Sequence, residues 1–193
     1  MNKPFNGKEK IVIAITGASG SLYARLLIDK LHHLYKTSIE RIAVLFSEEG
    51  KKIWHHELGT GWNDIPFPVY EPDDFNAPFA SGSSDFRKMI ICPCSMGTLG
   101  RIANGTSDDL ICRGADVMLK EKGQLILVVR EAPYNIIHLQ NMLSVANAGG
   151  TIYPACPSFY NKPQDKEQIL NTVVDRVLDM MGLPSNLSRW GQE

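Results

Sequence analysis

Short apolar runs alternate with amphipathic stretches along most of the chain. Four of the runs are aliphatic and bounded by polar or turn-forming residues, which is typical of buried strands. They are Lys10–Ile15, Arg41–Phe46, Lys88–Cys92 and Gln124–Val129. We expect the third run to stop at Pro93, because proline cannot donate to a strand ladder. Two shorter strands are predicted at Val69-Tyr70 and at Thr151–Tyr153.

The stretches between these runs carry apolar residues at helical spacing. The first follows Gly20, with a stripe formed by Leu22, Leu26, Leu27, Leu31 and Leu34. Further helices are predicted from Ser47 to about Glu57, at Ser95–Ala103, at Asp108–Lys120, at Asn135–Ala148, and around Ile169, Val173, Val177 and Met181 before Gly182. Because strands and helices alternate, we expect an α/β fold, a single Rossmann-like or flavodoxin-like three-layer domain with a mainly parallel sheet.

The composition fits one globular domain. The chain has 193 residues, of which 44% are hydrophobic and 21% charged, and we expect a core over about residues 10–182 with a tail over 183–193. A net charge of −1 favours neither nucleic acid nor an acidic membrane surface. No apolar run approaches the roughly 18 residues of a membrane span, and the first ten residues lack the apolar centre of a signal peptide.

The four cysteines lie at positions 92, 94, 112 and 156. Their spacing is not that of common zinc or redox pairs. We therefore expect reduced, packed thiols and a cytoplasmic protein.

Polar clusters follow the four main predicted strands. They are Thr16–Gly20, Ser47, Pro93–Thr98 and Arg130-Glu131. Ligands of open parallel sheets bind beyond the carboxyl ends of the strands, so these clusters are expected to converge on one site. The first cluster departs from the dinucleotide pattern GxGxxG, because Ser19 and Leu22 replace two glycines. Its free N–H groups suit a phosphate or the edge of a flavin; the alternative is a turn that binds no ligand.

The other clusters also have two interpretations. Ser47 and Ser95 could simply cap helices, or the N–H groups beside Ser95 could in addition bind an anion. Arg130 and Glu131 must leave the apolar layer where their strand ends. Either they form ion pairs at the sheet edge, with each other or with neighbouring residues, or Arg130 binds a phosphate and Glu131 handles a proton or orients a substrate.

Taken together, these segments closely resemble the flavin prenyltransferases of the UbiX type. The matching segments are Thr16–Gly20, Cys94–Ala103, Arg113–Leu119 with Lys120-Glu121, Arg130–Pro133, Pro154–Pro163 and Asp175–Asp179. The resemblance implies transfer of a dimethylallyl group, from dimethylallyl monophosphate or diphosphate, to N5 and C6 of reduced FMN. It also implies a homododecamer with active sites at subunit junctions, and a UbiD-type decarboxylase that uses the prenylated FMN.

The resemblance further implies a role for each matching residue. Those expected to hold FMN are Gly17, Ala18, Ser19, Ser47, Ser95, Met96, Gly97, Thr98 and Arg130. Those expected to bind the prenyl phosphate are Tyr160, Arg176, Lys120 and Arg113. Those expected to act in catalysis are Ser19, Glu57, Glu131 and Lys120, with Ser19 and Glu57 in proton handling.

The chemistry of the reaction agrees with a basic site. Breaking the prenyl–phosphate bond leaves an allylic cation and a phosphate that gains negative charge, so cations around that phosphate stabilise its departure. Lys120, Arg130 and Arg176 can do this without a metal ion, and we expect none. The acidic pairs Asp73-Asp74 and Asp108-Asp109 are isolated and fit a loop and a helix cap.

Aromatic side chains could shield the allylic cation. Tyr160 and Trp190 are the candidates, and the alternative for Trp190 is docking of the C-terminal tail.

Two other functions remain open. An FMN-dependent cysteine decarboxylase of related fold would need a histidine base and an Asn-containing loop, and the equivalent loop here, Pro93–Thr98, has no Asn. The histidines are expected on surface helices (His32, His33, His55 and His56) or packed in a helix (His138). A non-catalytic FMN carrier for a decarboxylase would keep the glycine turn, formed by Gly17–Gly20, but would not need Lys120, Tyr160 and Arg176.

Overall fold

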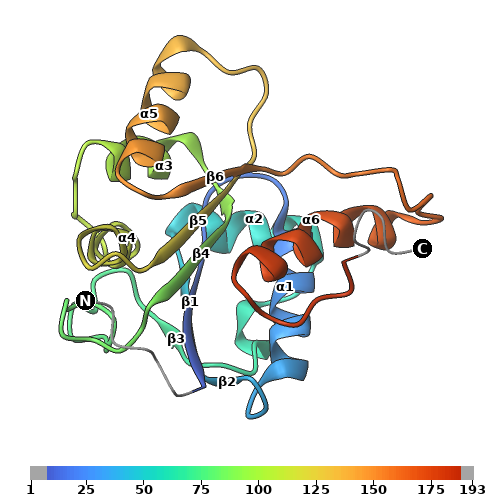
Figure 1. The fold of residues 1–193 in the computed structure, drawn as a ribbon, viewed down its shortest axis with the longest axis horizontal. Helices are drawn as coiled ribbons and strands as arrows, with labels where there is room; N and C mark the ends of the chain where they lie inside the picture. Colours follow the sequence, from blue (N-terminus) through green and yellow to red (C-terminus); the bar gives the residue numbers. More distant parts are fainter. Residues whose placement is uncertain (1–7, 188–193) are drawn as a thin grey trace.

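The computed structural model describes residues 8–187, which form three layers around a parallel sheet (Figure 1). The strands follow the order β3-β2-β1-β4-β5-β6, and every neighbouring pair is parallel. They are β1 (Glu9–Ile15), β2 (Ile39–Phe46), β3 (Val69–Tyr70), β4 (Lys88–Cys94), β5 (Gln124–Val129) and β6 (Thr151–Pro154). The predicted three-layer α/β fold is confirmed.

The strand order combines the two architectures that the sequence predicts. The six-strand order is that of dinucleotide-binding Rossmann folds, whereas the order without β3, which has two residues, is that of flavodoxin. In both versions the order reverses between β1 and β4. The carboxyl ends of these two strands therefore flank the switch point at which such sheets bind ligands.

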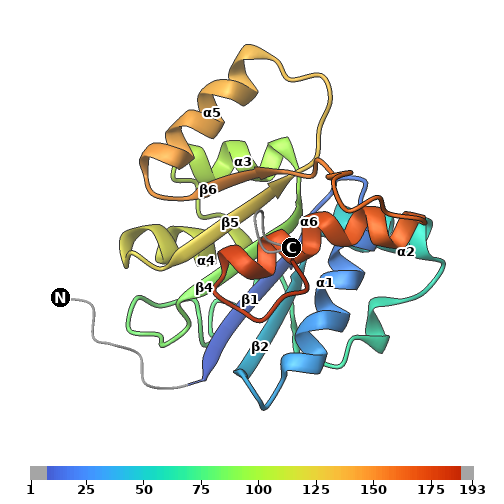
Figure 2. The same ribbon diagram turned by 45° about the vertical axis from the view of Figure 1, so that its right-hand side comes forward.

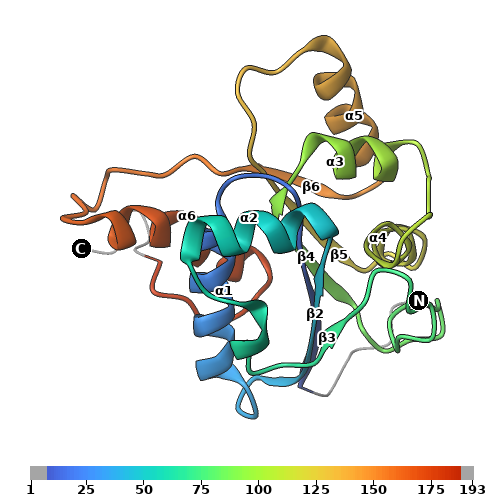
Figure 3. The ribbon, with the colours of Figure 1, turned by 180° about the vertical axis from the view of Figure 1, so that it is seen from behind.

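Helices cover both faces of the sheet (Figures 1 and 3). They are α1 (Ser21–Leu34), α2 (Glu48–Leu58), α3 (Met96–Ala103), α4 (Leu110–Lys120), α5 (Ile136–Asn147) and α6 (Lys166–Met180). Successive residues of β1 point to opposite faces, as a strand requires. Ile11, Ile13 and Ile15 pack in one buried cluster with residues of α1, α2 and α6, and Val12 and Ala14 pack in another with residues of α3 and α4.

The predicted end of β4 at Pro93 is wrong, because the strand continues to Cys94. The pairing with β5 is irregular between Ile91 and Cys94, so Pro93 lies at a bulge, where its missing N–H is tolerated. Its carbonyl still accepts a bond from the backbone N–H of Thr16 at 3.2 Å.

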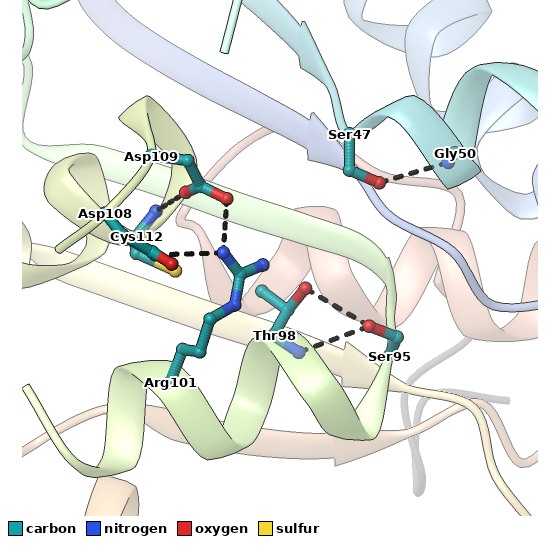
Figure 4. Close-up of polar contacts among 8 residues, drawn as sticks. All are labelled: Ser47, Gly50, Ser95, Thr98, Arg101, Asp108, Asp109 and Cys112. Carbon is teal, nitrogen blue, oxygen red and sulfur yellow. Dashed lines mark hydrogen bonds and ion pairs between the residues drawn. The ribbon is translucent and has the colours of Figure 1, made fainter. Parts of the chain in front are cut away.

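The predicted helix caps are confirmed (Figure 4). Ser47 accepts a hydrogen bond from the Gly50 N–H at 3.0 Å, and Ser95 accepts one from the Thr98 N–H at 3.2 Å. Asp109 caps α4 by accepting from the Cys112 N–H at 2.7 Å. These side chains fix where α2, α3 and α4 begin, and α2 and α3 start directly after the ends of β2 and β4.

Helix α5 stands away from the sheet beside α3 (Figure 2). Val145 is the one residue of α5 that is fully buried, while the helix exposes Ile136, Ile137, Leu139 and Leu143. Among residues 8–187, every helix is too short or too polar to cross a bilayer.

Candidate active site

The polar clusters at the strand ends meet at one edge of the sheet, as the sequence predicts. The Thr16 hydroxyl donates to the Pro93 carbonyl oxygen at 2.8 Å and accepts from the Ser95 N–H at 2.8 Å. The Arg130 Nε donates to the carbonyl oxygen of Ser19 at 2.8 Å. The ends of β1, β4 and β5 are thus joined directly, on both sides of the switch point.

The glycine turn already holds an anion from its own chain. The carboxylate of Glu57, near the end of α2, accepts from the Gly20 N–H at 3.0 and 3.1 Å and from the Ser21 N–H at 2.7 Å. The expectation that this turn offers free N–H groups is therefore wrong for Gly20 and Ser21, while contact of Gly17, Ala18 and Ser19 with a flavin stays a prediction. A carboxylate takes that position because the helix N-terminus attracts any negative group within reach.

The same contacts set the ionisation of Glu57. Desolvation raises the pKa of its carboxyl, but hydrogen bonds from the Ser19 side chain and from the Gly20 and Ser21 N–H groups outweigh it and lower the pKa below its ordinary value. The carboxylate is therefore ionised at neutral pH. The structure brings Ser19 and Glu57 together, which is the pairing that the resemblance implies.

Gly17 and Gly20 are glycines for reasons within the chain. A Cβ at Gly17 would lie 2.7 Å from the Cβ of Glu49, so glycine allows α2 to approach the turn. Gly20 has a φ of 126°, which side chains rarely adopt, and a Cβ there would meet the Tyr23 ring at 3.1 Å. The glycines shape the turn itself, and Ser19 is the side chain that the turn presents.

Of the three helices that directly follow β1, β2 and β4, α3 has the N-terminus best suited to a phosphate. The start of α1 is bonded to Glu57, and the first turn of α2 carries Glu48 and Glu49. The first turn of α3 has no acidic residue. The Met96 and Gly97 N–H groups lie in the first turn and have no intrahelical acceptor, so they are available to an anion.

Arg130 and Glu131 do not form a hydrogen-bonded ion pair in the part of the chain that the structure describes. Arg130 is bonded to the glycine turn, and a Glu131 carboxylate oxygen accepts from the Ala132 N–H at 3.0 Å. The structural alternative of a mutual pair at the sheet edge is therefore wrong. Both side chains are exposed at the edge and can reach a ligand there.

Two tyrosines at this edge were not identified from the sequence. Burial raises the pKa of Tyr23, and the charge of Arg130 counteracts this rise. Burial also raises the pKa of Tyr153, which the charge of Arg176 counteracts. The two arginines thus act on neighbouring tyrosines, which places Arg176, on α6, near the end of β6. The sequence carries no signal for these neighbours, because Tyr23 is a single tyrosine in an amphipathic helix and Tyr153 one in a short strand.

Tyr160 lies on an extended arm. Residues 155–165 contain no helix or strand and run from the end of β6 to the start of α6, away from the sheet (Figures 1 and 3). Tyr160 is 82% exposed, and Phe159 beside it is 67% exposed. On α6, Arg176 pairs with Asp179 at 2.7 Å and keeps about half of its side chain exposed.

Lys120 lies at the opposite edge of the sheet. It ends α4 just before β5 begins at Gln124, whereas Arg130 follows the other end of β5. Six residues of strand span roughly 20 Å. The Lys120 side chain approaches Gly82, in the loop that follows β3, so that a Cβ added at Gly82 would lie 3.2 Å from the Lys120 Nζ. Within one chain, Lys120 is therefore separated from the glycine turn.

Arg113 is bonded to the loop that follows β3. Arg113 and Lys120 are seven positions apart on α4, so they share a helix face. The Arg113 Nε donates to the Ala80 carbonyl oxygen at 2.9 Å, and its guanidinium pairs with Asp116 at 3.3 Å. Trp190, the other aromatic candidate, lies outside the described residues.

One group of potential metal ligands occurs within residues 8–187, formed by Asp108, Asp109 and Cys112. Arg101 occupies it, because its guanidinium bonds to Asp108 at 3.0 Å and to Asp109 at 2.6 Å (Figure 4). Burial also raises the pKa of the Cys112 thiol to about 12, so the thiolate that a metal needs is disfavoured. The cluster functions as a cap and an ion pair.

The thiols are free, as predicted, and Cys92, Cys94 and Cys112 are buried; the prediction that all four are packed is wrong for Cys156, which is exposed.

Comparison with known proteins identifies the family. The model of the family described as Flavoprotein matches residues 2–178. The flavin prenyltransferase UbiX of Methanocaldococcus jannaschii is 45% identical over 94% of this chain and 98% of its own. A crystal structure of AnUbiX in complex with FMN and dimethylallyl pyrophosphate is similar with a TM-score of 0.90 and 36% identity, covering 97% of this chain and 100% of that one.

A dodecameric, FMN-dependent UbiX-like decarboxylase from Escherichia coli O157:H7 is similar with a TM-score of 0.87 and 35% identity, covering 93% of this chain and 98% of that one. Sequence and structure thus agree over nearly the whole length of the chain. The chain belongs to the Flavoprotein family and, within it, to the flavin prenyltransferases of the UbiX type.

Proposed function

We propose that this chain transfers a dimethylallyl group from dimethylallyl monophosphate or diphosphate to N5 and C6 of reduced FMN. The observation that carries the proposal is the meeting of the glycine turn, the α3 N-terminus and Arg130 at the switch point of the sheet. Such an edge binds a flavin in this fold class. The relatives named above add the prenyl donor.

The edge fits FMN through several different groups. The α3 N-terminus, with the Ser95 and Thr98 hydroxyls, suits the FMN phosphate, because its first turn has no acidic residue and, unlike that of α1, is not bonded to a carboxylate. Ser19, Ser47 and Arg130 line the same edge and can hold the rest of the flavin. When bound, reduced FMN supplies the two ring positions that receive the prenyl group.

The chain's own residues provide the charge balance for the donor. As the carbon–oxygen bond breaks, the phosphate keeps the electron pair, and nearby cations lower the energy of that state. Tyr160 lies on the arm after β6 and Arg176 lies on α6, while Arg130 lies at the end of β5. Lys120 and Arg113 are the further cations that the resemblance implies.

Proton handling falls to Ser19 and Glu57. The ionised Glu57 carboxylate accepts a bond from the Ser19 hydroxyl and from two backbone N–H groups. It can therefore hold the hydroxyl in one orientation and take its proton as the hydroxyl oxygen accepts one from the substrate. Glu131, exposed at the same edge, can exchange a second proton with the substrate.

Lys120 reaches the flavin edge only if a second copy of the chain supplies it. It ends α4 at the opposite end of β5 from Arg130, which supports a site completed between copies, and Arg113 shares its helix face. The exposed face of α5 and the arm around Phe159 form apolar surface of the kind that monomeric proteins seldom expose. We infer a homo-oligomer, with the dodecamer of the family as the expected form.

The proposal is tested by incubating the chain with reduced FMN and a dimethylallyl phosphate and measuring the mass of the released flavin. The expected result is a flavin heavier by one dimethylallyl group. FMN that is bound but never gains mass with either donor would favour the carrier function. Transfer of the product to a UbiD-type decarboxylase and a cytoplasmic location stay predictions, tested by adding such a decarboxylase in its apo form and by cell fractionation.

A further inference from the structure

Thr16 is the last residue before the glycine turn, and 1% of its surface is exposed. Three hydrogen bonds run from this residue to the end of β4. Its N–H and its hydroxyl both donate to the Pro93 carbonyl oxygen, at 3.2 and 2.8 Å, and its hydroxyl accepts from the Ser95 N–H at 2.8 Å. One buried side chain thus spans both sides of Cys94.

These bonds replace a ladder that has already ended. The regular pairing of β1 with β4 extends only to Ala14 and Ile91. Beyond that point β4 contains its irregular segment and pairs at Cys94 with Val129 of β5. The two strands lie at the switch point, where the chain continues into different turns, so their ends need another connection.

The connection leads directly to the start of α3. Ser95, whose N–H is bonded to Thr16, accepts from the Thr98 N–H at 3.2 Å and donates to the Thr98 hydroxyl at 3.1 Å. A shift of the Ser95 backbone would therefore move the cap and the whole first turn of α3. On its other side, Thr16 is joined by the main chain to Gly17.

We propose that Thr16 is a positioning residue for flavin binding, whose hydroxyl fixes the glycine turn relative to the N-terminus of α3. The inference deepens the proposed function and rests on it. FMN would contact both turns at once, so its affinity depends on the distance between them. Thr16 itself touches no ligand, because its hydroxyl is bonded to the backbone on β4 and in the turn after it.

The test is FMN affinity in variants that separate the hydroxyl from the shape of the side chain. Thr16→Val keeps the branched shape and leaves the buried Ser95 N–H without its acceptor, so FMN should bind about three- to tenfold more weakly. Thr16→Ser keeps the hydroxyl and should bind FMN with native affinity. The KM for the prenyl donor should remain unchanged in both, because Thr16 is bonded to Pro93 and Ser95 and to none of the residues proposed to bind the donor.

A matched control separates positioning from a general loss of stability. Ile13 is fully buried in the same strand, and Ile13→Val removes a methylene without touching a hydrogen bond. This variant should melt earlier and bind FMN normally. Native FMN affinity in Thr16→Val, or equal weakening in Thr16→Ser and Thr16→Val, would overturn the inference.

A double-mutant cycle tests the route through Ser95. Thr16→Val and Ser95→Ala should be non-additive in FMN binding, because they disturb one connection, whereas Thr16→Val and Ser47→Ala should be additive. Additive effects in both cycles would contradict the proposal.

One further measurement needs no variant. The Ser95 amide should exchange its hydrogen slowly in the unmodified chain, and exchange at the rate of an exposed amide would also overturn the inference. If the unmodified chain bound no FMN, the proposed function would fail together with this inference. Native affinity in Thr16→Val removes only the role of Thr16.

Discussion

The separation of Lys120 from the glycine turn gives a test of whether the active site is shared between copies of the chain. Lys120→Ala removes a cation at the end of α4, and Arg130→Ala removes one at the other end of β5. Each variant alone should lose most of its prenyl transfer. The two are then assembled together, by co-expression with different tags and purification through both.

The expected recovery follows from the geometry. If each site takes Arg130 from one copy and Lys120 from another, each of these two residues has a one-half chance of being intact in an equal random mixture. About a quarter of the sites should therefore be complete, and the mixture should regain about that fraction of the native rate per site. A site made within one chain would contain a defect in every copy and regain nothing.

The assay is the rate at which prenylated flavin forms in the doubly tagged assembly. A mixture of each variant with itself, purified in the same way, serves as the control. A doubly tagged assembly with no activity above these controls would refute the shared site. Recovery near a quarter would locate Lys120 beside the flavin of a neighbouring copy.

Further predictions concern single positions. Arg176→Ala should lower turnover by about 10²-fold with FMN binding largely intact, because the arginine acts on the leaving phosphate; unchanged prenylation rates would count against it. Gly50→Ala places a Cβ 2.5 Å from the carbonyl oxygen of Ile15 and should lower the free energy of unfolding by about 1–3 kcal/mol, seen as a lower melting temperature. The control Gly61→Ala, whose Cβ would have its nearest neighbour 3.8 Å away, should be tolerated. Glu57 has a lowered pKa, so its stabilisation is present at neutral pH and disappears as the pH falls through that pKa. Glu57→Gln should therefore be less stable than the native chain at pH 7, with the difference disappearing in acid, and a pH-independent difference in urea unfolding would contradict this reasoning.

The strands, their direction and their common site edge are all evident in the sequence. The apolar runs are short and end at turn residues, so β1, β2 and β5 lie within two residues of their predicted positions. β4 differs because a proline normally ends a strand, and the bulge that accommodates Pro93 depends on its pairing with β5. The alternation of strands and helices was sufficient to predict the carboxyl edge as the site.

The sequence could not show which group fills each helix start. Glu57 is 37 residues from Gly20, and only the packing of α2 against the turn brings the carboxylate to those N–H groups. The position of Lys120 could have been deduced, since a helix that precedes a parallel strand ends at the opposite edge from the site. Thr16 belonged to the predicted cluster, but its positioning role could not be read there, because it depends on side-chain bonds to a backbone 77 and 79 residues away.

The most direct test of the central claim is mass spectrometry of the flavin released after reaction of reduced FMN with a dimethylallyl phosphate. If the edge formed by β1, β4 and β5 holds a flavin beside cations that withdraw the leaving phosphate, the flavin should gain one dimethylallyl group, and oxidised FMN should give none. A flavin recovered unchanged with both the monophosphate and the diphosphate would contradict the account.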